Sequence, residues 1–200
     1  MRIDLPEGQR RASFADWRQV ADITAEGFAD DPVNRWMVGT PRGIQSAFRT
    51  MTRDLYIKQG FTFLAGDDGA TMWAPPGSEA GLGPLARLRF AFGMARYAAP
   101  GAMKRALEIG KRMAEHHPKE PHMYLFTIAT RKSGRGKGVG KALLAPVLAA
   151  CDRDRVPVYL ENSNPEGNFG FYHAHGFERI TSFPVGEGGP MMEPMWREPR

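Results

Sequence analysis

Glycines alternate with other residues between Arg131 and Lys141, and this segment constrains the fold more than any other part of the sequence. They stand at Gly134, Gly136, Gly138 and Gly140. Glycine reaches positive φ angles and lets the backbone approach a ligand closely, so the run predicts a turn. A strand pattern at 122–130 precedes it, and an amphipathic helix pattern at about 138–152 follows it. We therefore expect a strand–turn–helix unit.

This turn is suited to hold an anion. The first amides of a helix have no partner inside the helix, and the helix dipole favours negative charge there. Arg135, Lys137 and Lys141 add cationic side chains at the same place. The alternative interpretation is a flexible basic turn without a ligand.

Counting residues excludes the two common nucleotide motifs. A P-loop needs a second glycine five positions after the first, and from Gly134 or Gly136 that position falls on Val139 or Lys141. The dinucleotide pattern Gly-x-Gly-x-x-Gly fails on the same two residues. The hexamer from Arg135 to Gly140 fits a different pattern, Arg-x-x-Gly-x-Gly.

The rest of the chain alternates between helix and strand patterns, which is typical of an α/β domain. Ser13 and Asp16 have the spacing of a capping box. In chain order we expect a tail or edge strand at 1–12, helices at 13–31 and 41–60, strands at 61–65 and 70–74, two helices within 80–116, strands at 122–130 and 156–161, a helix at 168–175, and strands at 177–185 and 191–196.

The two helices within 80–116 combine apolar spacing with many cations. Leu85, Leu88, Phe92 and Ala95 predict one buried stripe, and a second runs through Met103, Leu107 and Met113. The net charge is +5, so the cations could form a nucleic-acid-binding stripe. We favour a solvated helix face, because exposed aromatics are not interleaved with them, and we expect no nucleic-acid partner.

Composition places the chain among ordinary globular proteins, with 42% apolar and 24% charged residues over 200 positions. Cys151 is the single cysteine and lies on the apolar stripe of its helix, which predicts a buried side chain. The sequence has no apolar run of about 20 residues and no signal-peptide pattern at its start. We expect a cytoplasmic protein that makes no contact with membranes.

Three further segments give the glycine turn a family context. Arg135-Gly136-Lys137-Gly138-Val139-Gly140 matches the Gln/Arg-x-x-Gly-x-Gly/Ala signature of the GNAT superfamily of acetyl-CoA-dependent N-acetyltransferases. The surrounding segments occur in the family's order. A strand precedes the turn, the segment 158–165 follows it, and Asn168 to Phe177 then matches the family's Asn-x-x-Phe-Tyr-x-x-x-Gly-Phe segment. The chain therefore resembles this superfamily.

Within the superfamily, the segment from about 117 to 186 resembles the puromycin N-acetyltransferases. The shared features are His117-Pro118-Lys119-Glu120-Pro121, Leu125 to Ile128, Pro146 inside a helix, and Leu160-Glu161-x-Ser163. Lys132 stands where these relatives have proline. The N-terminal half, which mainly sets the acceptor, matches least.

The resemblance implies a GNAT fold: an α/β domain with a mixed, mostly antiparallel central sheet, a splayed parallel strand pair and helices on both faces. The strand at 122–130 would carry a bulge. We expect one domain over residues 1–200, with a cofactor-binding core at about 120–186 and acceptor-pocket elements mainly at 13–116.

The resemblance also implies acetyl-CoA as co-substrate and no metal. The pantetheine arm would lie on the backbone of Ile128, Ala129 and Thr130, and Asn168 would reach the same arm. The diphosphate would bind the amides of the turn, which are those of Arg135, Gly136, Lys137, Gly138, Val139, Gly140 and Lys141.

For catalysis the resemblance implies direct transfer to an amine, with Tyr172 near the sulfur as general acid and the amide of Ile128 polarising the thioester. Glu161 is a candidate base acting through water, or else a capping or ion-paired carboxylate. His122 either lines the amine pocket or is packed in the core. Asp30 or Asp31 could hold a cationic acceptor, although a helix-ending turn is the simpler interpretation.

The leading functional hypothesis is acetyl transfer to a small-molecule amine, with an antibiotic or aminonucleoside as one candidate acceptor. The alternative is an acyl-CoA-binding sensor of the same fold without transferase activity. We expect a monomer or a homodimer. His173 and His175 do not predict a metal site, because side chains two apart on a helix point in different directions.

Overall fold

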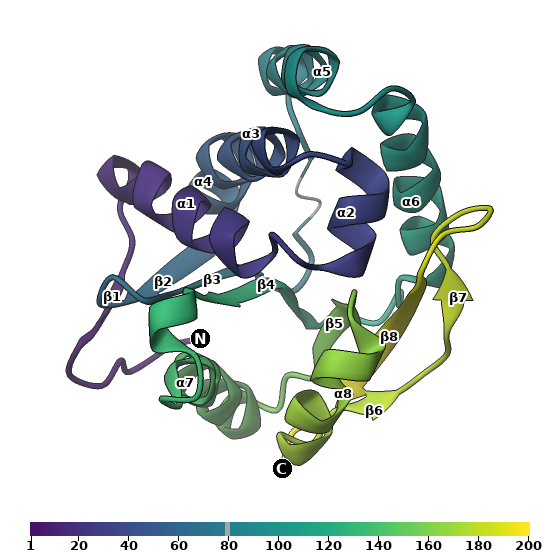
Figure 1. Cartoon of the computed structure of the whole chain (residues 1–200). Coiled ribbons are helices and arrows are strands. Elements are labelled where there is room, and N and C mark those ends of the chain that lie inside the picture. Colours follow the sequence, from purple (N-terminus) through teal and green to yellow (C-terminus); the bar gives the residue numbers. More distant parts are fainter. Residues whose placement is uncertain (79–80) are drawn as a thin grey trace.

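The computed structural model describes residues 1–78 and 81–200, and helices cover both faces of a single curved sheet (Figure 1). The elements are β1 (Gln9–Arg11), η1 (Phe14–Asp16), α1 (Trp17–Gly27), α2 (Pro32–Val38), α3 (Pro41–Met51), the π-helical turn η2 (Thr52–Tyr56), α4 (Ile57–Gln59), β2 (Phe61–Ala65), β3 (Gly69–Ala74), α5 (Pro84–Tyr97), α6 (Ala102–His116), β4 (Met123–Thr130), η3 (Lys132–Gly134), α7 (Val139–Asp154), β5 (Val158–Asn162), α8 (Pro165–Ala174), β6 (Glu178–Arg179), β7 (Phe183–Pro184) and β8 (Met191–Arg197).

The sheet has eight strands in the order β1-β2-β3-β4-β5-β8-β6, with β7 paired to β8. β4 and β5 are parallel, and the other neighbouring pairs are antiparallel. This confirms the expected mixed, mostly antiparallel sheet with one parallel pair.

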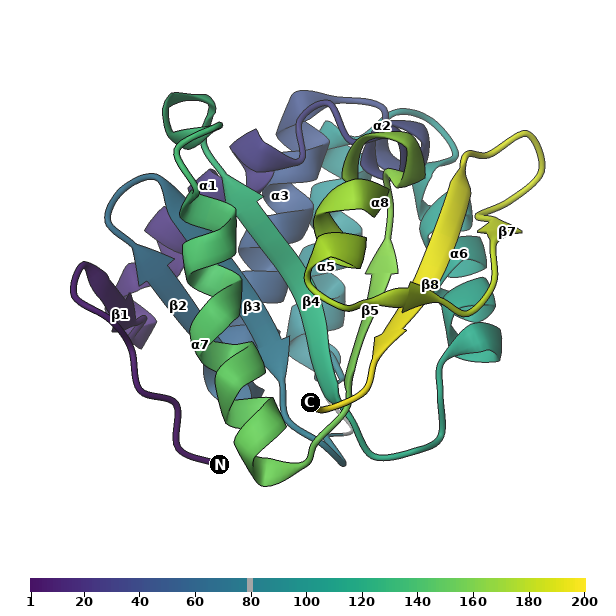
Figure 2. The ribbon, with the colours of Figure 1, turned by 90° about the horizontal axis from the view of Figure 1, so that it is seen from below.

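The parallel pair opens along its length. Cα partners join β4 to β5 only from Met123 to Leu125, although β4 continues to Thr130. On the other edge of β4, Met72 pairs with Thr127 and Trp73 with Leu125, so Phe126 is an extra residue that bulges from the ladder. Figure 2 shows β4 and β5 diverging toward the end where the glycine turn and α8 lie. Both the expected bulge and the expected splay are present.

The bulge also changes which face of the sheet each side chain of β4 enters. Tyr124 and Phe126 pack with the cluster under α1 and α3, whereas Leu125 packs with the cluster under α7. Beyond the bulge the alternation has shifted, because Ile128 packs on the α7 side and Ala129 on the α1 side. Regular alternation would have put Ile128 on the face of Phe126.

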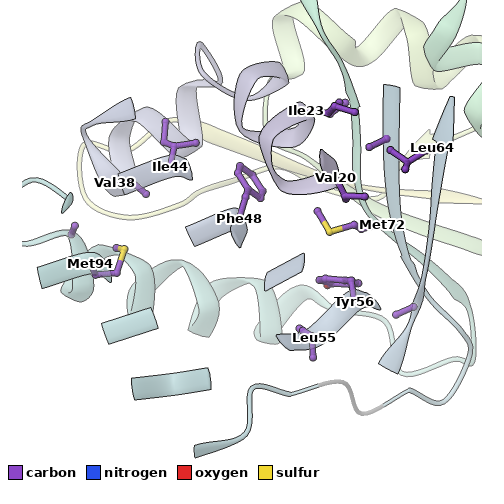
Figure 3. Packing of buried hydrophobic residues seen from close by; sticks show 14 residues of the cluster. Val20, Ile23, Val38, Ile44, Phe48, Leu55, Tyr56, Leu64, Met72 and Met94 are labelled. Carbon is purple, nitrogen blue, oxygen red and sulfur yellow. The ribbon is translucent and has the colours of Figure 1, made fainter. Parts of the chain in front are cut away.

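Two apolar clusters hold the layers together. The first joins α1, α3, η2 and β3 through residues such as Val20, Phe48, Tyr56 and Met72 (Figure 3). The second joins α7 to β3, β4 and β5 and contains buried Cys151, as the sequence predicted.

Local sequence signals explain most helix boundaries. Ser13 donates its backbone N–H and its hydroxyl to Asp16 Oδ2, at 2.7 and 2.8 Å, which confirms the capping box. The first long helix ends earlier than expected, at Gly27, and Pro32 begins a further helix, α2, that the sequence analysis did not predict. Asp31 caps α2 by accepting the Asn34 N–H at 2.8 Å.

The apolar stripe predicted for α5 is wrong. Leu85, Leu88 and Phe92 are 59%, 66% and 66% exposed, and Leu107 of α6 is 69% exposed. The buried residues of α5 are Ala86, Gly93 and Met94. A Cβ on Gly93 would lie 2.2 Å from Ser46 Oγ, so α5 approaches α3 closely at its small residues, with Met94 in the core and Leu85, Leu88 and Phe92 turned outward.

Among residues 1–78 and 81–200, none of the helices combines the length and apolar content needed to cross a membrane.

Gly60, between α4 and β2, tests how closely the chain at this point packs against β3. A Cβ there would lie 2.1 Å from the backbone oxygen of Trp73. We expect Gly60→Ala to lower the free energy of unfolding by about 1–3 kcal/mol through overpacking, measured by urea denaturation. Gly110→Ala is the matched control, because Gly110 is exposed within α6 and a Cβ there meets no atom within 4 Å. The control should gain about 0.5–1 kcal/mol; equal losses in the two variants would contradict the packing argument.

Candidate active site

The glycine turn presents free amides at the start of α7. Gly136 and Gly138 have φ angles of 75° and 77°, values that L side chains rarely adopt. The N–H of Ala142 bonds to Gly138 O at 2.9 Å, and it is the first amide that the helix geometry can satisfy. The amides of Val139, Gly140 and Lys141 therefore point out of the helix end. A Cβ at Gly136 or Gly138 would meet no atom within 4 Å, so the space beside the turn is open.

Acidic side chains from two other segments fix the turn in place. Glu26 of α1 accepts the backbone N–H of Lys132 at 3.0 Å and pairs with Arg131, and that backbone bond is the main cause of its lowered pKa. Asp68 of the β2–β3 turn accepts the hydroxyl of Ser133 at 2.5 Å. The turn is thus attached to α1 and to the β2–β3 hairpin, which argues against the flexible-turn alternative.

Three cations of the turn remain available for an anion. Arg135, Lys137 and Lys141 are exposed, and none of them forms an ion pair within the part of the chain that the structure describes. The free amides, the open space and these unpaired cations fit a diphosphate.

The edge of β4 beyond the bulge adds backbone groups to the same place. No β5 partner faces the segment from Phe126 to Thr130, which includes Ile128, Ala129 and Thr130. A Cβ on Gly140 would lie 3.5 Å from Phe171 of α8 and 3.9 Å from Ile128 Cδ1. The structure therefore brings the start of α7, the free edge of β4 and helix α8 together.

Tyr172 lies on α8 in the cluster under α7 and is buried. Burial, followed by the charge of Asp31, raises the pKa of its hydroxyl, so the phenol keeps its proton at neutral pH. Asn168 is half-buried and precedes Tyr172 by one helical turn, so both occupy one side of α8.

Asp31 connects this region to the N-terminal half. It is buried, and its carboxylate accepts the Ser163 hydroxyl at 2.5 Å and the Asn34 amides at 2.8 Å. Burial raises its pKa. Asp31 therefore caps a helix and bonds to the loop after β5, whereas Asp30 is exposed and lies 3.8 Å from Arg35.

A second group of titratable side chains surrounds Glu161, which we call the Glu161 cluster. Its members are His117, His122, Tyr124, Tyr159 and Glu161. Val158 and Leu160 pack under α7, so the alternation of β5 turns Tyr159 and Glu161 to the opposite face. The cluster and Tyr172 consequently lie on opposite faces of the sheet, next to the opening between β4 and β5.

Within the cluster, His117 Nδ1 lies 3.4 Å from Glu161 Oε1. The ring of His117 is centred 5.0 Å from His122, 5.4 Å from Tyr124 and 4.8 Å from Tyr159. Sequence reasoning did not select His117 as a site residue, because its position in the loop after α6 carries no spacing signal that links it to Glu161.

His122 is a packed core residue rather than a pocket-lining residue. Its Nδ1 lies 2.7 Å from Glu120 O, and its ring contacts the rings of Tyr159 and Trp196. Burial lowers its pKa.

Other candidate features do not gather at this place. No group of three potential metal ligands occurs within residues 1–78 and 81–200. His175 Nδ1 lies 2.7 Å from Phe171 O, and His173 stacks on Phe169. A surface hollow of about 540 Å³ between α3 and α5 is lined by Thr40, Pro41, Arg42, Arg96 and Tyr97 and includes none of the candidate site residues.

Comparison with known proteins agrees with this geometry. The sequence model of the Acetyltransferase (GNAT) family matches residues 93–177, which include the glycine turn, Glu161 and Tyr172. An uncharacterized N-acetyltransferase of Schizosaccharomyces pombe is 23% identical over 188 residues, covering 84% of this chain and 73% of that protein.

Solved structures share the fold over nearly the whole chain. A structure described as histone acetyltransferase HPA2 and related acetyltransferase, from Corynebacterium glutamicum, is 26% identical, has a TM-score of 0.72, and matches over 96% of each chain. The PaiA N-acetyltransferase of Thermoplasma acidophilum, solved with coenzyme A, is 11% identical with a TM-score of 0.54 and covers 99% of each chain. The chain has the GNAT fold. The family match and these neighbours together support the conclusion that it is a GNAT-superfamily acetyltransferase.

Proposed function

We propose that the protein is an N-acetyltransferase that moves an acetyl group from acetyl-CoA to the amine of a small molecule. The observation that carries this proposal is the opening between β4 and β5. The anion-binding turn lies at its end, and Tyr172 and the Glu161 cluster lie on either face. A binding module would need the turn but not a buried phenol and a buried carboxylate beside it.

Residues of this chain would hold acetyl-CoA at two places. The free amides of the turn and of the start of α7, with the cationic side chains of Arg135, Lys137 and Lys141, would bind the diphosphate; the amides of Arg135 and Lys137 already bond to Lys132 O and Gly134 O within the turn. The free edge of β4 at Ile128, Ala129 and Thr130 would bond the pantetheine arm, with Asn168 beside it. Acetyl-CoA would supply an activated acetyl thioester, and the backbone amide of Ile128 would polarise the carbonyl of that thioester.

The remaining chemistry is proton transfer. An acceptor ammonium gives up two protons as its nitrogen bonds to the acetyl carbon and the carbon–sulfur bond breaks. One proton goes to the Glu161 cluster and from there to solvent. Tyr172 donates to the departing sulfur, and the second proton of the amine restores the phenol. The raised pKa of Tyr172 means that the phenol is protonated at neutral pH and is present as a proton donor.

We further propose a small acceptor rather than a protein chain. The side chain of Glu161 is 3% exposed and Tyr172 is 8% exposed, so most of the groups beside the opening lie below the surface, and His117 is the member of the pair with Glu161 that reaches solvent. The resemblance of residues 117–186 to the puromycin N-acetyltransferases makes aminonucleosides the first compounds to test. The whole chain would act as one domain, and the comparisons give no support to a sensor without transferase activity.

Gly138 tests the diphosphate site. A β-branched residue at φ 77° is strained by about 1–2 kcal/mol, and the strain would turn the free amides away from the ligand. We expect Gly138→Val to weaken coenzyme A binding at least about tenfold by calorimetry, since about 1.4 kcal/mol corresponds to a factor of ten. Gly188→Val is the control, because Gly188 has φ 66° and open space in the β7–β8 turn, far along the chain from the site. Equal affinities in the two variants would contradict the assignment.

Tyr172 tests the general acid. Tyr172→Phe removes the proton donor and keeps the ring, so we expect kcat to fall by about 10²–10⁴-fold while coenzyme A binding persists. The measurement is thiol release with acetyl-CoA and a panel of aminonucleosides, aminoglycosides, polyamines and a histone peptide. Tyr97→Phe, which changes a partly exposed tyrosine at the end of α5, should behave as wild type. Preferential turnover of the histone peptide would refute the small-acceptor proposal, and unchanged kcat in Tyr172→Phe would refute the acid role.

A further inference from the structure

We propose that His117 is the general base of the reaction and that Glu161 orients it. This assignment rests on the proposed function and divides the roles inside the Glu161 cluster. The observation behind it is a histidine and a carboxylate 3.4 Å apart, of which only the histidine reaches solvent.

Exposure distinguishes the two groups. The Glu161 side chain is 3% exposed, whereas that of His117 is 36% exposed. A base must touch the proton that it removes, and an acceptor approaching from solvent meets the imidazole before the carboxylate. Glu161 is covered by the rings of the cluster, so it is placed to act through His117.

The hydrogen-bonding capacity of the pair sets the tautomer. An ionised carboxylate only accepts, so His117 must carry its proton on Nδ1 to bond with Glu161. Nε2 is then left with a free lone pair, which is the atom that can take a proton from an ammonium. A buried carboxylate on one imidazole nitrogen and a free second nitrogen is the arrangement that a histidine base requires.

The backbone explains why the histidine holds this position. His117 caps the C-terminal end of α6 and precedes Pro118, which disfavours the helical conformation for His117. Its backbone is extended, with φ −70° and ψ 127°. The chain therefore turns away from α6 at His117 and directs the ring toward β5.

The other titratable groups that face this pair are less suited to the task. His122 of β4 is buried, its Nδ1 faces Glu120 O, and burial lowers its pKa. Burial and the charge of Glu161 raise the pKa values of Tyr56 in η2, Tyr124 in β4 and Tyr159 in β5, so these phenols stay protonated.

Nε2 of His117 takes one proton of the acceptor ammonium, and the freed electron pair forms the nitrogen–carbon bond as the carbon–sulfur bond breaks. The departing sulfur takes the proton of Tyr172, and the second proton of the amine restores the phenol. The resulting imidazolium lies beside the Glu161 carboxylate and afterwards releases the proton to water, because the His117 side chain is 36% exposed.

The kinetic test compares His117→Gln, Glu161→Gln and His116→Gln under saturating acetyl-CoA. His116 is the matched control, because its ring stacks on Phe183 and its Nδ1 lies 2.8 Å from Arg112 O. We expect His117→Gln to lower kcat about 10²–10⁴-fold and to remove the acidic limb of the pH–rate profile, with coenzyme A affinity unchanged. Glu161→Gln should lower kcat while keeping that limb, and His116→Gln should match the wild type.

Rescue separates a chemical role from a structural one. Added imidazole should restore part of the kcat of His117→Ala, because free imidazole can supply the missing base, and it should not restore Glu161→Gln. Wild-type kcat in His117→Gln, or loss in His117→Ala that imidazole leaves unchanged, would overturn the assignment while the proposed function stands. Absence of any amine acetylation by the wild type would overturn both.

A measurement independent of activity covers the case in which the variants fold poorly. Long-range ¹H–¹⁵N NMR of the wild-type protein reports which nitrogen of each neutral imidazole carries the proton. We expect Nδ1–H for His117. An Nε2–H tautomer would overturn the proposal, because His117 could then neither donate to Glu161 through Nδ1 nor accept a proton at Nε2.

Discussion

The early end of the β4–β5 ladder is the constraint on which the rest of the site depends. Pairing stops after Leu125, and the extra residue Phe126 bends β4 away from its parallel neighbour. A sheet interior normally satisfies every backbone group, so the gap creates donors and acceptors that an extended ligand can use. The same bulge shifts the alternation of β4, which puts Ile128 against Gly140 and Phe171. One inserted residue thus supplies both the opening and its lining.

The stacking of Tyr56 on Phe126 connects this irregularity to another one. Their ring centroids are 4.3 Å apart with an interplanar angle of 11°, and Tyr56 ends the π-helical turn η2. Asp54 in the same turn is buried and bonds to Arg89 of α5 at 3.0 Å. Single π-helical turns often mark functional sites. Here the widened turn brings an aromatic ring over the bulge, so the segment between α3 and β2 contacts β4 at its irregular residue.

The sequence predicted the periodic parts of this molecule and the glycine turn, because apolar period and glycine spacing are local signals. It did not predict the bulge from residues alone; the expectation came from family resemblance. Helix α2 was missed because Asp31-Pro32 was interpreted as the end of the preceding helix, whereas that helix ends at Gly27 and Asp31 caps the next one. On α5 the apolar period was real but faced solvent, since Gly93 and Ala86 allow closer contact with α3 than leucine or phenylalanine would. His117 could not be selected, because its approach to Glu161 spans 44 positions of sequence and depends on how the loop after α6 folds back.

The two halves of the chain meet at acidic side chains that accept hydrogen bonds from the loops of the candidate site. Glu26 and Asp68 bond to Lys132 and Ser133 on the outer side of the glycine turn, and Asp31 bonds to Ser163 beyond β5. Each of these carboxylates accepts hydrogen bonds from the loop that it fixes, and Glu26 also pairs with Arg131. These bonds fix the loops and leave the side chains of Arg135, Lys137 and Lys141 exposed. The elements that would receive the acceptor amine are attached, through α1 and α2, to the loops that would hold the acetyl donor.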